Sequence, residues 1–458
     1  MNLGILEKVA KASDLTIGKP LGLMVRFSIP LLISNVLQLM FTIVDSAIIG
    51  RILGVEAFAA IGVTAAPHWL ILSTVLGVSH GFGTLIAQRF GAKDMDRMRR
   101  GFITAAYLSA IFSIAIAVFG VISTGPLMHM LNTPDEIING SVIYLRWILG
   151  AMPLTMAYNL FAMTLYALGD SKSPLRGMAI AFVLNIIFDL VLVFPFGIAG
   201  VALASILAQF AAFVYCFIAL RKIGVFVNCS YKWDLPSTKP LLCLALPLGF
   251  RNAVIEVGGL VVQRYVNEYG TEFVAGIAVA RRMYALIMIA GGAIEASIST
   301  FVAQNFGAKQ LDRVKKGVRD GMRLALAVSI VIMLFSLFFG RPIMGLLIEG
   351  DPKQVGAVLD YGGRQLMLMA LGLPVLYMLF LYRAALQGIG NTFIPFLSGV
   401  AELIMRLFSV LFLTKLWGEW GVYLSETLGW PAAVLLLVIA YYIVYKQKKK
   451  GSISWVKG

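Results

Sequence analysis

Long apolar runs, separated by short polar segments, cover most of the chain. The runs are close to the ~20 residues that an α-helix needs to cross a bilayer, and they exceed the ~10 residues of a membrane β-strand. The pattern therefore predicts a membrane protein built from α-helices. Twelve spans are expected, at residues 27–50, 60–89, 102–124, 137–168, 174–195, 198–220, 242–267, 273–304, 322–340, 355–387, 393–415 and 420–445.

One junction between an apolar run and a polar segment occurs twice. The stretch TLIAQRFGAKDMDRMRRG at residues 84–101 returns as TFVAQNFGAKQLDRVKKG at residues 300–317, with ten of eighteen positions identical. Gly91 and Gly307 are expected to end the second helix of each half, because glycine is common where helices end. A repeat of this length predicts two structurally similar halves.

Two halves with an even number of spans have the same orientation in the membrane. The expected fold is an all-α polytopic membrane protein, with twelve transmembrane helices in two pseudo-symmetric six-helix lobes around a central cavity. The expected order is a cytoplasmic N-terminal segment, a first lobe, a cytoplasmic linker, a second lobe and a basic cytoplasmic tail, at 1–26, 27–221, 222–241, 242–445 and 446–458. No small-residue cleavage site precedes the first run, so no removable signal peptide is expected.

Composition and charge agree with a membrane location. Of the 458 residues, 59% are hydrophobic and 13% are charged, whereas soluble domains carry roughly 25% charged residues. The net charge is +15, and the basic residues gather in alternate loops at 90–101, 169–177, 221–241 and 305–323 and in the tail. This bias places both termini in the cytoplasm of a multi-pass protein of the cytoplasmic membrane, and it requires no nucleic-acid partner.

A polar stripe follows the first span. Ser34, Gln38, Thr42 and Asp45 are separated by four, four and three residues, which places them on one face of a helix. A charge at the centre of a bilayer costs at least ~2.5–3.5 kcal/mol, so the stripe is expected to face protein or water and to serve a function.

A second carboxylate lies on the fifth span. Asn185 and Asp189 are four residues apart and share a helix face. Two neighbouring carboxylates share a proton or a cation more readily than both ionise. Polar side chains of the fourth and sixth spans are expected around them: Tyr144, Thr155, Asn159, Ser205 and Gln209. These oxygens predict a proton site, or a Na⁺ site at Asp45, Asn185 and Asp189.

The second half carries other intramembrane charges. Glu256 and Glu295, together with Gln38 and Thr42 of the first span, are secondary candidates for a role in ion coupling. Glu402 and Arg406 are four residues apart and are expected to neutralise each other. The histidines are isolated and receive no role: His68, His80 and His129.

These features resemble the multidrug and toxic compound extrusion (MATE) family over residues 20–445. The resemblance rests on the two six-helix lobes, the AQ-x-FGA ends of the second and eighth spans, and the P…Q…VD…IG pattern of the first helix. It implies export of organic cations and amphipathic drugs, driven by inward flow of H⁺ or Na⁺, with no organic cofactor.

The resemblance also implies where the ion acts. One branch of the family couples transport through a first-lobe network, which this sequence matches at Asp45, Tyr144, Asn159, Asn185 and Asp189, with Ser205 as the nearest match for a hydroxyl on the sixth helix. Another branch pairs a glutamate of the seventh helix with an aspartate of the tenth. Glu256 matches that glutamate approximately, but the tenth span has no mid-membrane carboxylate, so coupling through the first lobe is favoured.

The expected mechanism is alternating access by a monomer. Pro30 leaves a carbonyl unpaired in the first helix and makes bending easier, and ion binding can shift the equilibrium between inward-open and outward-open states. The sequence leaves two other kinds of transporter as alternatives. One is a lipid-linked oligosaccharide flippase, which would need basic charge at Arg251, Arg281 and Arg282. The other is a dedicated metabolite exporter. A membrane enzyme is disfavoured, because no nucleophile–base pair or cluster of metal ligands is evident in the sequence.

Overall fold

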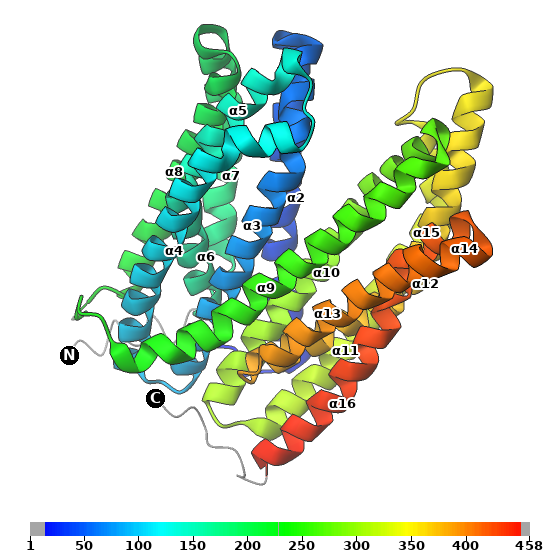
Figure 1. Ribbon diagram of the computed structural model, residues 1–458. Helices are drawn as coiled ribbons and strands as arrows, with labels where there is room; N and C mark the ends of the chain where they lie inside the picture. Colours follow the sequence, from blue (N-terminus) through cyan, green and yellow to red (C-terminus); the bar gives the residue numbers. More distant parts are fainter. Residues whose placement is uncertain (1–13, 228, 450–458) are drawn as a thin grey trace. The chain divides into compact units, whose positions relative to one another are not determined.

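The computed structural model describes residues 14–227 and 229–449. Helices account for all the regular structure of these residues (Figure 1). The first seven are α2 (Pro20–Ile52), α3 (Gly54–Gly91), α4 (Met95–Met130), α5 (Asp135–Gly150), α6 (Met152–Ala167), α7 (Lys172–Phe196) and α8 (Ile198–Ile223). Residues 1–13 of the expected N-terminal segment and 450–458 of the expected tail lie outside the described part of the chain.

The remaining helices follow a segment that ends at Asp234. They are α9 (Leu235–Val266), a 3-10 turn η1 (Asn267–Tyr269), α10 (Thr271–Gly307), α11 (Leu311–Gly345), α12 (Pro352–Gly388), α13 (Phe393–Phe408), a π-helical turn η2 (Ser409–Leu413), α14 (Thr414–Trp417), α15 (Glu419–Thr427) and α16 (Gly429–Lys449).

The number of membrane spans agrees with the prediction. Among the described residues, eleven helical stretches are long and apolar enough to cross a membrane, and α5 with α6 makes a twelfth that bends by 45°. The bend falls at Ala151, and Pro153 sits in the first turn of α6. Proline is tolerated there because the first N–H groups of a helix have no intrahelical partner.

The two copies of the repeated junction fold alike. α3 ends at Gly91 and α10 ends at Gly307, as expected. Lys93 and Lys309 then adopt left-handed backbone angles, with φ of 60° and 59°. The N–H of Lys93 donates to Phe90 O over 2.9 Å, and the equivalent bond in the second copy is 3.0 Å long. The duplication therefore encodes a helix-ending turn.

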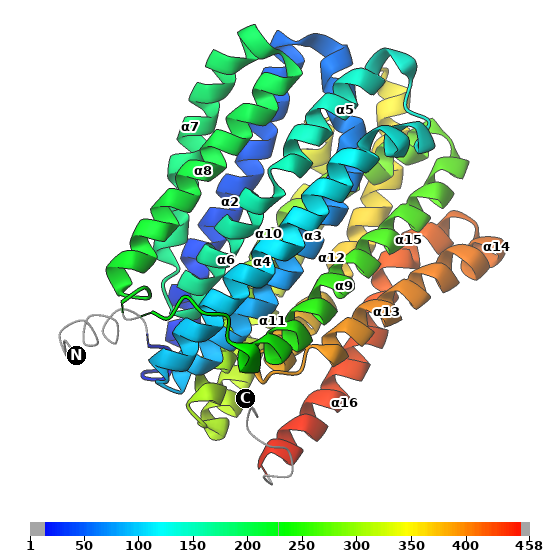
Figure 2. The same ribbon diagram turned by 60° about the vertical axis from the view of Figure 1, so that its left-hand side comes forward.

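The chain divides into two compact units. The first comprises residues 14–17 and 26–249, and the second comprises 18–25 and the described residues from 250 onward. Within the first unit, α7 and α8 run side by side (Figure 1; Figure 2), and α3 packs against α4, α5 and α6. Within the second, α10 packs against α11 and α12. Both boundaries fall inside long helices, α2 and α9.

The first half of α9 packs closely on α3. A Cβ atom added at Gly81 would lie 2.4 Å from Ala245 Cα, and one added at Gly77 would lie 2.5 Å from Leu248 O. Glycines four residues apart let two membrane helices approach at backbone distance. This contact explains why α9 belongs to the first unit as far as Gly249.

Candidate functional site

Asp45 of α2 lies inside the first unit. Its side chain is buried, and its Oδ2 accepts a hydrogen bond of 3.2 Å from the Ser205 hydroxyl of α8. The match of Ser205 to a sixth-helix hydroxyl was approximate in the sequence, and this contact gives that residue a position next to the carboxylate. The contact ties α2 to α8.

The second carboxylate is near the first. Asp189 and Asn185 of α7 are fully buried, and both lie close enough to Asp45 to interact with it electrostatically. Asp45 Oδ1, both oxygens of Asp189 and both polar atoms of the Asn185 amide make no hydrogen bond within the described residues. Buried polar groups are nearly always paired. These orphaned oxygens therefore suit a bound proton or a small hard cation.

Asp45 also faces a cavity of about 340 Å³ within the first unit. Asn185 and Asp189 are not among its lining residues. Most of the lining is apolar, and the polar side chains that reach it are Gln38, Thr42, Asp45, Ser46, Thr64, His68, Tyr144, Thr155, Tyr158, Asn159, Ser205 and Gln209. A mainly apolar pocket with a few polar groups is the usual form of a small-molecule site.

The fourth span reaches this cavity in two pieces. Tyr144 comes from α5, whereas Thr155 and Asn159 come from α6, so the bend at Ala151 does not separate them. Thr155 Oγ1 donates to Gln209 Oε1 over 2.7 Å, and Asn159 Nδ2 donates to the Thr155 carbonyl over 2.8 Å. These bonds fix the amide groups that line the pocket.

His68 was expected to have no role, but it reaches the cavity. It lies on α3 and lines the cavity, together with Thr64 and Leu72 at steps of four residues. That spacing marks one helix face and was visible in the sequence. It received no role because the one carboxylate of α3, Glu56, lies in the first turn of the helix, twelve residues before His68, and the positions between them are mainly apolar.

Both candidate glutamates of the second unit lie near an arginine. Arg251 Nη1 lies 3.6 Å from Glu295 Oε1, and Glu256 lies within electrostatic range of Arg406. Neither glutamate joins a cluster of three or more potential metal ligands among the described residues. The four secondary candidates therefore lie in different places. Gln38 and Thr42 line the cavity, whereas Glu295 is paired with Arg251 and Glu256 is near Arg406.

The expected pairing of Glu402 with Arg406 is wrong. Glu402 pairs with Arg383 of α12, and Arg406 pairs with Glu426 of α15 at 2.6 Å. The Arg383 Nε also donates to Ser398 Oγ over 2.9 Å. Both α13 residues point inward, and side chains from other helices reach them with better geometry than the neighbour one turn away.

Comparisons with known proteins agree with this architecture. The MatE family model matches residues 30–191 and 247–410. The probable multidrug resistance protein YoeA of Bacillus subtilis is 28% identical over 443 residues, covering 92% of this chain and 94% of that protein. The probable multidrug resistance protein YpnP of the same organism is 32% identical over 309 residues, covering 66% of this chain and 69% of that protein.

A solved structure shows the same fold. The chain superposes with a TM-score of 0.88 on a MOP superfamily transporter of Pyrococcus furiosus. That structure is described as having a binding pocket of reverse polarity, which suggests a different function for it. The two chains are 18% identical, and the match covers 96% of this chain and 99% of that one. With a family model matched in each half, the chain belongs to the MatE family, the multidrug and toxic compound extrusion transporters.

Proposed function

We propose that the protein is a secondary active antiporter that exports organic cations or amphipathic drugs in exchange for H⁺ or Na⁺. The observation that carries the proposal is the position of Asp45. One of its oxygens is held by Ser205, the other has no partner, and the residue lines a mainly apolar cavity. The relatives named as probable multidrug resistance proteins support the substrate class.

Competition for one carboxylate explains the exchange. A drug cation in the cavity and a coupling ion among Asp45, Asn185 and Asp189 both need the negative charge of the same carboxyl group. When an ion neutralises that charge, the cavity attracts a cation less strongly, and the drug is released. Tyr144, Asn159 and Ser205 line the same cavity, and Ser205 orients the Asp45 carboxylate through its hydrogen bond.

The conformational part of the cycle involves α2. Pro30 lies within α2 and cannot donate the usual backbone hydrogen bond. Ion binding at Asp45, on the same helix, can favour one shape of α2 only through different affinity for the two states. Alternating access of the two lobes then moves the cavity from cytoplasmic to external exposure.

The proposed location is the cytoplasmic membrane. The basic loops support a multi-pass protein of the cytoplasmic membrane, with both termini in the cytoplasm. We infer a monomer that works as a transporter rather than an enzyme.

Two other substrate classes are weaker. A flippase for lipid-linked sugars needs free positive charge to hold a pyrophosphate. Here Arg251 is paired with Glu295, and Arg281 donates to Gln263 and is near Glu426. A dedicated metabolite exporter would use the same cavity, and a substrate screen distinguishes it.

The test is transport by the purified protein in lipid vesicles. A pH gradient and a Na⁺ gradient are imposed separately, and uptake of a fluorescent organic cation is followed. Asp45→Asn should lower ion-driven transport by about 100-fold or more, which corresponds to about 2.7 kcal/mol of lost stabilisation. Asp360→Asn is the matched control, because this carboxylate is exposed and paired with Arg341. Wild-type-like transport by Asp45→Asn would overturn the proposal.

A further inference from the structure

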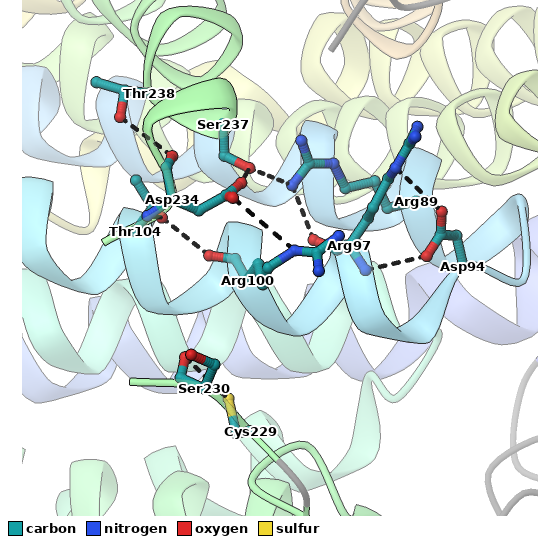
Figure 3. Close-up of polar contacts among 10 residues, drawn as sticks. All are labelled: Arg89, Asp94, Arg97, Arg100, Thr104, Cys229, Ser230, Asp234, Ser237 and Thr238. Carbon is teal, nitrogen blue, oxygen red and sulfur yellow. Dashed lines mark hydrogen bonds and ion pairs between the residues drawn. The ribbon is translucent and has the colours of Figure 1, made fainter. Parts of the chain in front are cut away.

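The segment that leads into α9 is fastened to one face of α4. The attachment points on α4 are Arg97, Arg100, Thr104 and Tyr107, at steps of three, four and three residues. This spacing places them on one face of the helix. Figure 3 shows Arg100 and Thr104 directed towards Asp234 at the start of α9. The Arg97 side chain instead extends to Asp94, and only its carbonyl takes part in the attachment. All the residues concerned belong to the first unit.

Asp234 is the centre of this attachment. Its backbone N–H donates to Thr104 Oγ1 over 3.1 Å, and its carboxylate lies 3.8 Å from the Arg100 Nε (Figure 3). Ser237 donates to the same carboxylate, and Thr238 donates to the Asp234 carbonyl over 3.3 Å. Asp234 therefore both starts α9 and binds it to α4.

Arg89, at the end of α3, completes the attachment. Its Nη1 donates to Ser237 Oγ and to the Arg97 carbonyl, each over 2.8 Å (Figure 3). The side chain is buried, and Gly101 makes room for it, since a Cβ there would lie 2.5 Å from Arg89 Nη1. We refer to Arg89, Arg100, Thr104, Asp234 and Ser237 as the linker clasp.

Aromatic contacts extend the clasp. The rings of Tyr107 and Trp233 are stacked, with centroids 5.7 Å apart and planes inclined by 20°. The Tyr107 hydroxyl donates to the Tyr231 carbonyl, and the Trp233 Nε1 donates to Thr238 Oγ1, each over 2.8 Å. The segment from Tyr231 to Thr238 is thus held at several points.

The second copy of the junction lacks these groups. The positions equivalent to Arg89, Arg100, Thr104 and Tyr107, each 216 residues later, are Asn305, Lys316, Asp320 and Arg323. The helix-ending turn is common to both copies, but the residues that hold the linker occur in the first copy alone. The clasp is therefore an addition to the repeat.

We propose that Arg89, Arg100 and Asp234 are positioning residues for transport. They fix the first half of α9 to the first unit, together with the close contact of Gly77 and Gly81. Motion between the lobes then bends α9 near Pro247 and Gly249, where the unit boundary falls. Without the linker clasp, the segment before α9 would move instead and α9 would bend less. The role in transport rests on the proposed alternating access, whereas the fastening of α9 does not.

The experiment combines hydrogen exchange with transport, using the full-length protein in vesicles. Asp234→Ala and Arg89→Asn (the second-copy residue) should speed exchange of residues 231–246 by about tenfold or more, and leave α7 and α8 unchanged. The maximal rate of efflux should fall by about fivefold or more, while the KM for the drug should change less than about twofold. Lys316→Ala, at the position equivalent to Arg100, should change neither quantity.

A charge swap separates positioning from simple folding. Arg100→Asp lowers the maximal rate, and adding Asp234→Arg should restore a large part of it. Unchanged exchange at 231–246, faster exchange of the whole first unit, or normal transport despite local loosening would each overturn the inference. If the wild-type protein shows no ion-driven efflux, the proposed function fails instead, and the exchange measurement alone decides whether the clasp holds α9.

Discussion

Ser205 donates a hydrogen bond to Asp45 although 160 residues of chain separate them. The bond leaves Asp45 Oδ1 as a buried oxygen without a partner. One side of the carboxyl group is therefore anchored to α8, while the other side remains available to a proton, a cation or a drug. This division makes Ser205 a sensitive position for testing the site.

Ser205→Ala should weaken ion-driven transport without abolishing it. A hydrogen bond to a charged group contributes about 1.5–3 kcal/mol, so the initial rate of drug efflux should fall by roughly 10- to 150-fold. Ser205→Thr keeps the hydroxyl and should retain most of the activity. Equal loss in both variants would show that side-chain volume, and not the hydrogen bond, matters at this position.

Sequence periodicity was sufficient to predict the features that depend on a single helix, namely the number of spans and the residues that share a helix face. The length of the apolar runs follows from bilayer thickness, and this gave the number of spans. The stripe that contains Asp45 and the pair Asn185 and Asp189 followed from helical spacing alone. Burial of these carboxylates was expected because lipid excludes charge.

Contacts between different helices could not be predicted from sequence periodicity. The spacing of Glu402 and Arg406 suggested a pair, but packing brings each of them a partner from another helix. The bend at Ala151 and the place of His68 likewise depend on neighbouring helices. Spacing along a chain reports only which residues share a face, and many packings satisfy the same spacing.

Breaking the pair of Arg383 and Glu402 should destabilise the protein strongly. Both side chains are 5% exposed, so Glu402→Gln leaves a buried guanidinium without a counter-charge and should cost about 3–5 kcal/mol of unfolding free energy. The double change Arg383→Met with Glu402→Leu should recover most of this loss, because it removes both charges. Unfolding in detergent, compared across the single and double variants, measures the effect.

The exposed pair of Arg341 and Asp360 is the control for that measurement. These side chains are 61% and 55% exposed, so Asp360→Asn should change stability by no more than about 1 kcal/mol. A similar loss from the exposed and the buried pair would contradict the assignment of Glu402 to the interior of its unit.

Gly81→Ala should destabilise the first unit. The new methyl group would lie 2.4 Å from Ala245 Cα, which is backbone and cannot rotate away. Overpacking of this kind costs about 1–3 kcal/mol. Gly62→Ala, on the same helix with nothing within 4 Å, is the matched control and should be neutral or slightly stabilising. Thermal unfolding of the purified variants compares them, and equal melting temperatures would refute the close contact of α3 with α9.

Ala65→Phe should restrict the range of drugs. Ala65 lines the cavity, whose volume of about 340 Å³ is near the lower end of small-molecule sites. A phenyl ring there fills space that a bulky organic cation needs, and steric overlap of about 1–3 kcal/mol should raise its KM by roughly 5- to 150-fold. A small quaternary ammonium ion should be affected much less, because the ring leaves the Asp45 carboxylate in place. Ala66→Phe, at an adjacent exposed residue that does not line the cavity, should leave both KM values near those of the wild type. An unchanged KM for the bulky cation in Ala65→Phe would mean that drugs bind elsewhere than in this cavity.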